Sequence, residues 1–435
     1  MIAQSPFMIM ATIDPEQQDE LRQLLAGVNQ APGVADADNE LIPFAQFAQL
    51  HFARFTILVA NTNDDIRDYG IEPTPWAPAL VFVGDVDGPL QKFLAELVIR
   101  AGDGIRRIFS HCRDFGAPRG DRALLDWLLA HNVKPKANYV NWRGRTVVQI
   151  REEDALVRAL RERLPQEQAA AGNDPYALHR RLREFVDAEV ADLRLHLSPE
   201  PPTQGDQLVC NLLHLLGVPL ALLVLAPIFV IAAPVYFLWL RALEESDPEN
   251  IPRPGREHIA ALAEQEDILV TNQFNVLGLV KPGLFRSYTI RFLLWILDYS
   301  ARHIYNRGYL TRVRSIHFAR WVLLDDNRRV YFASNYDGSL DSYMDDFINK
   351  VGWGLNLVFS NGVGYPRSRW LIKGGAKFEG KYKKTLRRNQ LPSETWYKAY
   401  PDLGAFEIAQ NTRIRKGREK ENPGSRELRE WVSML

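Results

Sequence analysis

The feature that most constrains this chain is an internal repeat, in which one set of sequence landmarks occurs twice in the same order. The segment Leu50-His51-Phe52-Ala53-Arg54-Phe55 returns as Ile316-His317-Phe318-Ala319-Arg320-Trp321. Further along, Val86-Asp87-Gly88-Pro89-Leu90 returns as Tyr336-Asp337-Gly338-Ser339-Leu340. Since self-similarity over this distance indicates one structural unit present twice, the sequence predicts two domains with the same fold.

Each half has the pattern strand, helix, two strands, helix, with a shorter helix and a final strand closing it. In the first half these elements are expected at 7–13, 15–28, 49–60, 79–84, 88–111 and 137–142, and in the second half at 273–280, 283–304, 314–324, 329–334, 338–360 and 394–400. This βαββαβ order is the ferredoxin-like split motif, whose sheet has helices on one face only. We therefore predict an α+β fold in which two tandem ferredoxin-like repeats form a pseudo-dimeric α+β barrel.

An apolar insertion separates the two repeats, because the chain carries no Asp, Glu, Lys or Arg from Leu208 to Leu240. A single span of about 20 residues would place the repeats on opposite sides of a bilayer, and two spans would need more than about 40 residues. A bent monotopic hairpin, broken at Pro219, Pro227 and Pro234, satisfies both limits. A single span, with barrels completed between molecules, and a buried pair of core helices remain alternatives.

These features divide the chain into four segments. Residues 1–150 form the first repeat, 151–207 an amphipathic helical linker, 208–241 the apolar monotopic or transmembrane segment, and 242–435 the second repeat with a basic C-terminal region.

At the level of element order the chain resembles the dimeric α+β barrel superfamily, which includes dye-decolourising peroxidases and chlorite dismutase-like haem proteins. The peroxidases carry a Gly-x-x-Asp-Gly motif whose spacing Gly84-Asp85-Val86-Asp87-Gly88 matches, whereas Ser334-Asn335-Tyr336-Asp337-Gly338 lacks the first glycine. The resemblance implies a pocket enclosed by two ferredoxin-like units and a haem within it. Both copies also lie at a strand-to-helix turn, where Asp-Gly commonly forms the turn and caps the helix.

The repeated polar residues are the candidate catalytic groups: Arg320, His317, Asp337, Arg54, His51 and Asp87. Strand alternation predicts that His317 and Arg320 point to opposite faces, one of them toward the space between the sheets. A buried guanidinium needs an anionic partner or ligand, and a neighbouring histidine supplies acid-base chemistry. The alternative is that these residues hold the two sheets together symmetrically.

His303, near the end of a predicted helix, is the candidate axial ligand if a haem is bound, although a histidine in this position more often interacts with the helix dipole. His111 and Cys112 are adjacent but lack the further ligands of a zinc site, so no metal site is expected. Two cysteines are too few for a disulfide framework, in keeping with a reducing compartment.

The net charge is zero, but basic residues gather toward the C-terminus. They form two clusters: Lys381, Lys383, Lys384, Arg387 and Arg388, and then Arg413, Arg415, Lys416, Arg418 and Lys420. A solvated surface is the simplest interpretation, and anionic lipid headgroups are the predicted partner if the clusters bind one. Nucleic acid is not expected, because no nucleic-acid-binding motif accompanies the charges. Residues 1–14 do not read as a secretory signal, so we expect a membrane-associated protein on the cytoplasmic side.

Two functions from different classes follow. The first is a membrane-attached haem peroxidase-like oxidoreductase acting on an apolar substrate from the bilayer, which rests on fold-level analogy and the apolar insertion. The second is a non-enzymatic carrier or sensor that binds a lipid or another small apolar ligand in the barrel pocket. A pseudo-enzyme scaffold on anionic membranes is a third possibility.

Overall fold

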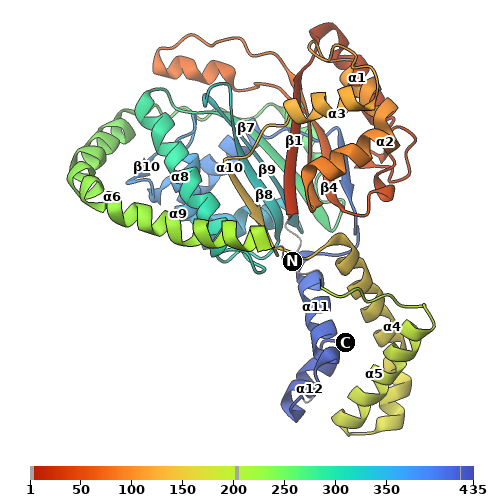
Figure 1. Ribbon diagram of the computed structural model, residues 1–435. Helices are drawn as coiled ribbons and strands as arrows, with labels where there is room; N and C mark the ends of the chain where they lie inside the picture. The colour runs from red at the N-terminus through yellow and green to blue at the C-terminus, as the bar shows by residue number, and fades with distance from the viewer. Residues whose placement is uncertain (1–3, 201–204, 422) are drawn as a thin grey trace.

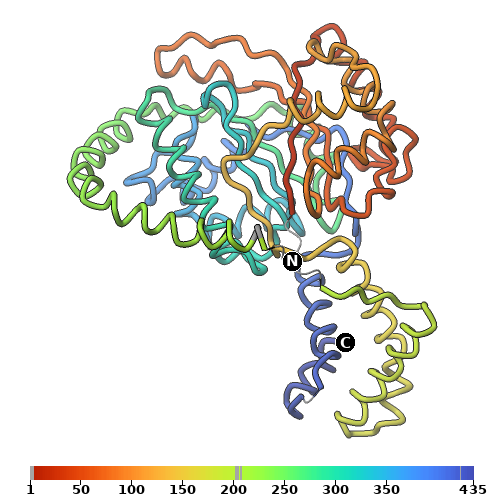
Figure 2. The backbone as a smooth tube through the Cα atoms, in the orientation of Figure 1, coloured from red at the N-terminus to blue at the C-terminus, as the bar shows by residue number. Residues whose placement is uncertain are grey.

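The computed structural model describes residues 4–200, 205–421 and 423–435, so residues 201–204 of the predicted linker lie outside it. The chain is a mixed α+β protein whose two larger sheets lie at its centre, with helices on their outer faces (Figure 1). A group of helices extends away from the sheets at one end, and one long helix curves along a side of the molecule (Figures 1 and 2).

The two larger sheets have six and four strands, and β10 (Ser368–Arg369) pairs with β11 (Lys373–Gly374) in a third, two-stranded sheet. The six-stranded sheet contains, in spatial order, β1 (Gln4–Thr12), β5 (Ala79–Asp87), β4 (Leu50–Leu58), β12 (Thr395–Lys398), β3 (Val34–Ala35) and β2 (Asn29–Ala31). The four-stranded sheet contains β6 (Ala137–Val140), β8 (Ile316–Leu324), β9 (Arg329–Asp337) and β7 (Thr271–Leu279). Both sheets are open over the described part of the chain, and no closed barrel is seen there.

The final strand of each half belongs to the sheet of the other half, which the sequence pattern did not predict. β6 pairs antiparallel with β8, with Ala137 opposite Trp321, and β12 pairs antiparallel with β4, with Trp396 opposite Arg54. The prediction that these strands close their own halves was therefore wrong. Alternation and length identify a strand, but they do not say which of two similar sheets will accept it.

The two halves nevertheless follow one plan in detail. The paired helices α2 (Leu90–Phe109) and α9 (Leu340–Phe359) each contain one non-helical residue, Ala101 and Val351, at the same distance from the preceding Asp-Gly turn. The first half adds α1 (Gln18–Ala26) and α3 (Asp121–Ala130), and the second half adds α8 (Leu284–His303) and α10 (Glu379–Asn389).

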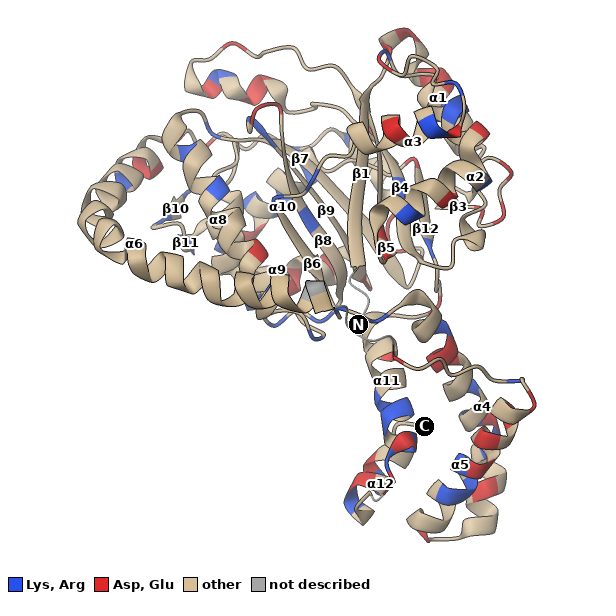
Figure 3. Cartoon of the chain, in the orientation of Figure 1, with Lys and Arg blue, Asp and Glu red and all other residues tan. Residues whose placement is uncertain are grey.

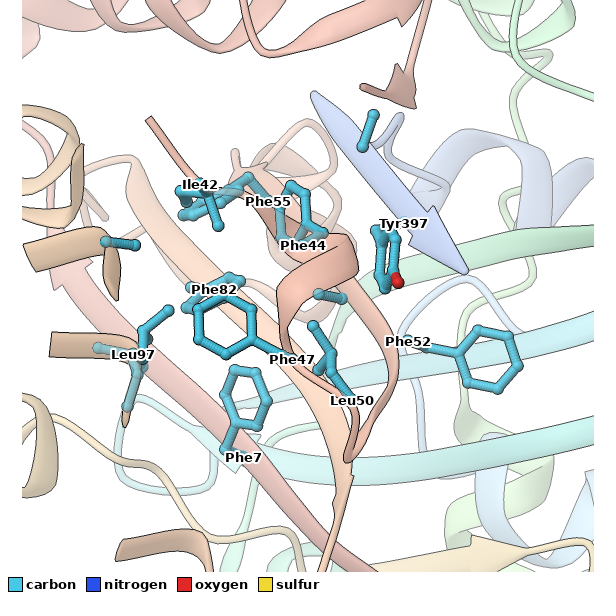
Figure 4. Packing of buried hydrophobic residues seen from close by; sticks show 14 of the residues in the cluster. Phe7, Ile42, Phe44, Phe47, Leu50, Phe52, Phe55, Phe82, Leu97 and Tyr397 are labelled. Atoms are coloured by element: carbon cyan, nitrogen blue, oxygen red, sulfur yellow. The ribbon is translucent and has the colours of Figure 1, made fainter. Parts of the chain in front are cut away.

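The outer face of the six-stranded sheet packs on α1, α2 and α3 around a core of aromatic residues (Figure 4). Tyr397 of β12 stacks on Phe44, with ring centroids 4.9 Å apart, so the exchanged strand completes the core of the other half. Between the sheets, Met8, Val81 and Val83 meet Leu277, Val322 and other apolar side chains of the opposite sheet. The two sheets therefore pack face to face over a filled interface.

Four helices form the extension below the sheets: α4 (Val147–Ala171), α5 (Pro175–Ala191), α11 (Ala405–Glu419) and α12 (Ser425–Val432). They share a small core, in which Leu156, Leu160 and Leu182 pack against Ile414 and Trp431. The predicted linker helices thus pack against the C-terminal region rather than standing alone.

The apolar insertion forms a single helix, α6 (Gly205–Ser246), of 42 residues, which the short α7 (Arg256–Ala263) follows. The predicted hairpin was wrong, because the chain does not turn back at any of the three prolines. Pro219, Pro227 and Pro234 are spaced by eight and seven residues, so they lie on a similar side of the helix and their individual bends add. The helix is accordingly curved (Figure 1).

Candidate functional site

The two repeated arginines cross the interface between the sheets in opposite directions. Arg54 of β4 donates to the backbone oxygens of Phe274 (3.3 Å) and Ser334 (3.1 Å), and to the side-chain oxygens of Asn275 (2.9 Å) and Asn335. Every one of these acceptors lies on the opposite sheet.

Arg320 of β8 makes the reciprocal set of contacts. It donates to the backbone oxygens of Phe7 (2.7 Å) and Gly84 (3.1 Å), and its Nη2 lies 2.5 Å from Oδ2 of Asp85. Both arginines are only 3% exposed, so each guanidinium is held entirely by protein atoms in the described chain. These contacts support the structural alternative, in which the arginines join the two sheets.

The two arginines differ in charge compensation. Asp85 pairs with Arg320, whereas Asn335 occupies the corresponding place beside Arg54. Burial accordingly lowers the pKa of Arg54 to about 10, because no carboxylate is in direct contact to offset the lost hydration. Burial also raises the pKa of Asp85 above its usual value, against the opposing effect of Arg320.

His51 and His317 lie at matched β-bulges, and this changes the face they occupy. The register of β4 against β5 shifts between Leu50 and Phe52, and that of β8 against β9 shifts between Ile316 and Phe318. A bulge adds one residue and re-aims its side chain. Each histidine therefore faces the inter-sheet side, as the arginines do, and the prediction of opposite faces was wrong.

Each histidine forms a hydrogen bond with the aspartate at the end of the neighbouring strand. His51 Nε2 lies 3.0 Å from Asp87 Oδ1, and its Nδ1 lies 3.0 Å from the hydroxyl of Tyr400. His317 Nε2 lies 2.6 Å from Asp337 Oδ1. The two pairs are close neighbours across the interface, since the ring of Tyr400 is 5.9 Å from that of His51 and 6.4 Å from that of His317.

The second oxygen of each aspartate caps a helix of the extension. Asp87 Oδ2 accepts from the backbone N–H of Val147 (2.8 Å), the first residue of α4, and Asp337 Oδ2 accepts from that of Ala405 (2.6 Å), the first residue of α11. A carboxylate at a helix N-terminus accepts from a backbone N–H that has no partner within the helix, and it interacts favourably with the positive end of the helix dipole. His–Asp pairs suit acid-base chemistry, but here both carboxylate oxygens are already engaged in structural contacts.

The second pair has additional partners that the first lacks. Thr271 donates to Asp337 Oδ1 (2.5 Å), and Lys398 Nζ donates to Thr271 Oγ1 (2.5 Å) and to the backbone oxygen of Leu403 (2.7 Å). Although burial acts to raise it, His317 and the hydrogen bonds from Thr271 and Ala405 hold the pKa of Asp337 below its usual value. Burial lowers the pKa of Lys398 to about 8.

An open polar hollow of about 860 Å³ adjoins Asp337. Arg312 and Arg314 from the loop before β8, together with Lys350 and Glu407, contribute to its wall. His317 itself is 3% exposed and does not line this hollow. The geometry thus gives Asp337 one side toward solvent while its histidine stays in the interface.

The second half also contains an apolar cavity, which sequence reasoning missed. It has a volume of about 160 Å³ and lies between α8, α9 and the outer face of the four-stranded sheet. Phe274, Trp321 and Phe332 come from the sheet, Leu297 and Ser300 from α8, and Tyr343, Trp353 and Gly354 are among the residues from α9. No Lys, Arg, Asp, Glu, His or Cys is among its lining residues.

In the first half a longer connection packs against the helix that corresponds to α9. Residues 27–49 link α1 to β4, whereas residues 304–315 link α8 to β8. The longer connection crosses α2 at Gly104, where an added Cβ would lie 1.9 Å from the backbone oxygen of Leu41. At the matching Gly354 only a side chain of its own helix is near, and Gly354 lines the cavity.

His303 lies outside this cavity and is already engaged. Its Nε2 is 2.8 Å from Nδ1 of His214 on α6. A haem with His303 as axial ligand does not fit this arrangement, because the ligand atom faces another histidine and the cavity offers no cation for the propionates. Over the described residues, no group of three or more His, Cys, Asp or Glu is placed to hold a metal ion.

The basic residues near the C-terminus are mostly paired within the chain. Lys381 contacts Glu249, Arg388 contacts Asp65, and Arg418 contacts Asp187. Lys383, Arg387, Arg415, Lys416 and Lys420 also have carboxylate partners. Figure 3 shows basic and acidic residues interspersed along α11, α12, α4 and α5.

A scan against models of known protein families finds no match, and a comparison with curated proteins finds none either.

Proposed function

We propose that this protein is a monotopic membrane protein that binds a small apolar molecule in the cavity between α8 and α9. The single observation that carries the proposal is the exposure of α6. From Leu208 to Leu240 it carries no Asp, Glu, Lys or Arg, and only 6% of its most apolar 18 residues are buried. Exposed apolar area of this extent indicates contact with lipid or a partner.

The exchanged strands support attachment from one side. β6 precedes α6 in the chain, β8 follows it, and the two strands are hydrogen-bonded neighbours. A helix that crossed the bilayer once would separate these strands by the thickness of the membrane. Both ends of α6 therefore belong on the same side.

Contacts between α6 and α8 support a helix that lies along the body and bows outward. His214 meets His303 near one end, and the Tyr236 hydroxyl lies 3.2 Å from Thr289 Oγ1 near the other. On α6, His214 and Tyr236 are separated by about 33 Å of helix, whereas on α8 their partners His303 and Thr289 are separated by about 21 Å. The longer path must bow away, which exposes its middle to lipid.

α8 adds an aromatic surface beside α6. Tyr288, Phe292 and Trp295 are 62%, 45% and 38% exposed, and Phe229 of α6 lies 6.1 Å from Phe292 between ring centroids. Aromatic residues of this kind favour the membrane interface. The same helix supplies Leu297 to the cavity wall, so a molecule leaving the bilayer along α8 reaches the cavity over apolar surface.

The size and lining of the cavity define the ligand class. An apolar cavity of about 150 Å³ holds a benzene-sized molecule, and it stays dry when empty. The ligand is therefore a small aromatic or aliphatic compound, or a short stretch of a longer chain.

At the level of architecture, we propose that the two halves are ferredoxin-like modules that have exchanged their last strands.

The test uses a variant that fills the cavity from its rim. Leu297→Trp occupies the cavity, and Leu164→Trp on α4 is the matched control, because Leu164 is half-buried in the helical extension. Toluene at tenfold its Kd should raise the free energy of unfolding of the wild type and the control by about 1.4 kcal/mol, measured by thermal unfolding. The variant with the filled cavity should not be stabilised in this way. An equal shift in all three proteins would count against a specific site.

The haem peroxidase-like oxidoreductase remains a prediction, to be distinguished by a visible absorption spectrum of the purified protein. A Soret band would favour the oxidoreductase. A colourless protein that still binds toluene would favour the apolar-ligand function.

A further inference from the structure

Five ionisable side chains gather where the start of α6 meets the end of α8. They are Arg143, His214, Asp298, Arg302 and His303. The His214 and His303 rings are in direct contact, and the ring of Tyr299 lies 4.9 Å from that of His303 between centroids. Arg302 Nη2 lies 3.2 Å from Asp298 Oδ2.

The cluster carries more positive charge than the protein compensates. It holds two guanidinium groups but one carboxylate: among the described residues Asp298 forms an ion pair with Arg302, and its Oδ1 accepts from the backbone N–H of Asn138 (3.3 Å). The Nε atoms of Arg143 and Arg302 are buried and have no hydrogen-bond partner among the residues that the structure describes. Burial, together with the neighbouring charge of Arg302, lowers the pKa of Arg143 to about 10. Donors left in this state favour an anion that accepts from them.

The position of the cluster identifies the anion. His214 lies six residues inside the apolar stretch that begins at Leu208, on the part of α6 that contacts the body. Next to it, Tyr299 donates to the backbone oxygen of Leu215 (3.0 Å), so tyrosine and arginine meet at the edge of the apolar helix. In a protein attached through α6, this edge lies at the depth of lipid headgroups.

We infer that Arg143, Arg302 and the His214–His303 pair form a site for the phosphate of an anionic phospholipid. The inference rests on the proposed membrane attachment and adds the lipid class to it. Guanidinium groups suit phosphate because they present several donors in a fixed plane. Ser300 and Tyr305, which line the apolar cavity, lie on either side of Arg302 and His303 in the chain, so the bound lipid would sit beside the cavity.

The test compares vesicle binding by the protein of residues 1–435 and by two double variants. Arg143→Gln/Arg302→Gln removes both charges from the site. Arg122→Gln/Arg158→Gln is the matched control, because those arginines are exposed and pair only with residues four positions away, on α3 and α4. Each protein is titrated with neutral phosphatidylcholine vesicles and with vesicles containing phosphatidylglycerol.

The wild type and the control should prefer the phosphatidylglycerol vesicles, and the site variant should bind them about 30-fold more weakly, at about a factor of five for each arginine. Binding to neutral vesicles should be unchanged in all three. If the double variant fails to bind neutral vesicles, Arg143→Gln alone carries the test, since no ion pair of Arg143 is lost, with an expected loss of about fivefold.

Inorganic phosphate and chloride at equal ionic strength distinguish a phosphate site from diffuse attraction. Phosphate should release the wild type from phosphatidylglycerol vesicles more effectively than chloride does. Equal release by both salts, or an anionic preference that survives in the site variant, would overturn the inference. If the wild type does not bind neutral vesicles at all, the proposed membrane attachment is overturned instead.

Discussion

At the scale of single residues, the interface between the sheets depends on buried charge. Arg320 and Asp85 are both almost fully buried and form one ion pair across the sheets, and Asp85 Oδ1 has no partner in the described chain. Removing one member of a buried pair leaves an uncompensated charge, which costs more than losing the pair as a whole.

Arg320→Ala is therefore expected to destabilise the protein by about 3 to 5 kcal/mol. Arg54→Ala should cost less, because it leaves neutral carbonyl and amide acceptors rather than a carboxylate. Urea unfolding of both variants, with Arg320→Ala/Asp85→Ala completing a double-mutant cycle, measures the difference. Strictly additive effects at Arg320 and Asp85 would contradict a direct ion pair.

Asp337 predicts a pH dependence of stability. Its pKa is lower in the folded protein than in the unfolded chain, so its contribution is present above the unfolded value of about 3.9 and is lost as the pH falls below it. The stability difference between the wild type and Asp337→Asn should thus be larger at pH 6 than at pH 3. Urea unfolding at the two pH values measures it, and a constant difference would show that the carboxylate charge contributes nothing.

At the scale of elements, the sequence predicted most of the helices and strands but not the partners of the last strands. The predicted segment 88–111 became α2 at 90–109, and 314–324 became β8 at 316–324. Periodicity determines such elements locally. The pairing of β6 with β8 depends instead on which sheet edge is free in the folded molecule, which no local pattern contains.

The candidate site was predicted in the same partial way. His51, Arg54 and Asp87 do lie together with their repeat partners at one interface, as the repeat suggested. Their strand faces were not predictable, because a β-bulge shifts the alternation by one residue without a distinct sequence pattern. The one available indication of the apolar cavity was the shorter connection after α8 than after α1.

The two glycines at matching positions of α2 and α9 test how differently the two helices are packed. Gly104→Ala places a Cβ against the Leu41 backbone and should destabilise by about 1 to 3 kcal/mol or more. Gly354→Ala meets only the Val351 side chain of its own helix, whose Cγ1 lies 3.0 Å from the added Cβ, and it should change stability by less than about 1 kcal/mol. Thermal unfolding of the two variants gives the comparison. Similar losses for both would mean that the second half is packed as tightly as the first.

At the scale of the whole molecule, strand exchange makes the two halves interdependent. β12 lies between β4 and β3 in the six-stranded sheet, so residues 1–207 alone lack an internal strand. Expressed separately, residues 1–207 and 208–435 should aggregate, whereas together they should associate into a folded complex. Co-purification of one tagged half with the other tests this. A soluble, cooperatively unfolding 1–207 fragment would contradict the interdependence.

The interdependence of the halves also determines how the chain can meet a membrane. Since strands from before and after α6 share each sheet, the proposed membrane attachment has to leave both sheets on one side of the bilayer. The whole molecule is thus a single body with one long apolar helix along its side, and α8 beside that helix carries exposed aromatic residues. We propose that α6 attaches this body to the membrane from one side only.

The most direct test is cysteine labelling in sealed vesicles. Starting from Cys112→Ala/Cys210→Ala, single cysteines are placed at Glu184 on α5, at Glu257 on α7 and at Leu223 on α6, all of which are exposed. With a membrane-impermeant maleimide, we expect positions 184 and 257 to react to the same extent in the same vesicles, and position 223 to react only after detergent is added. Reaction of 184 and 257 from opposite sides would contradict the account.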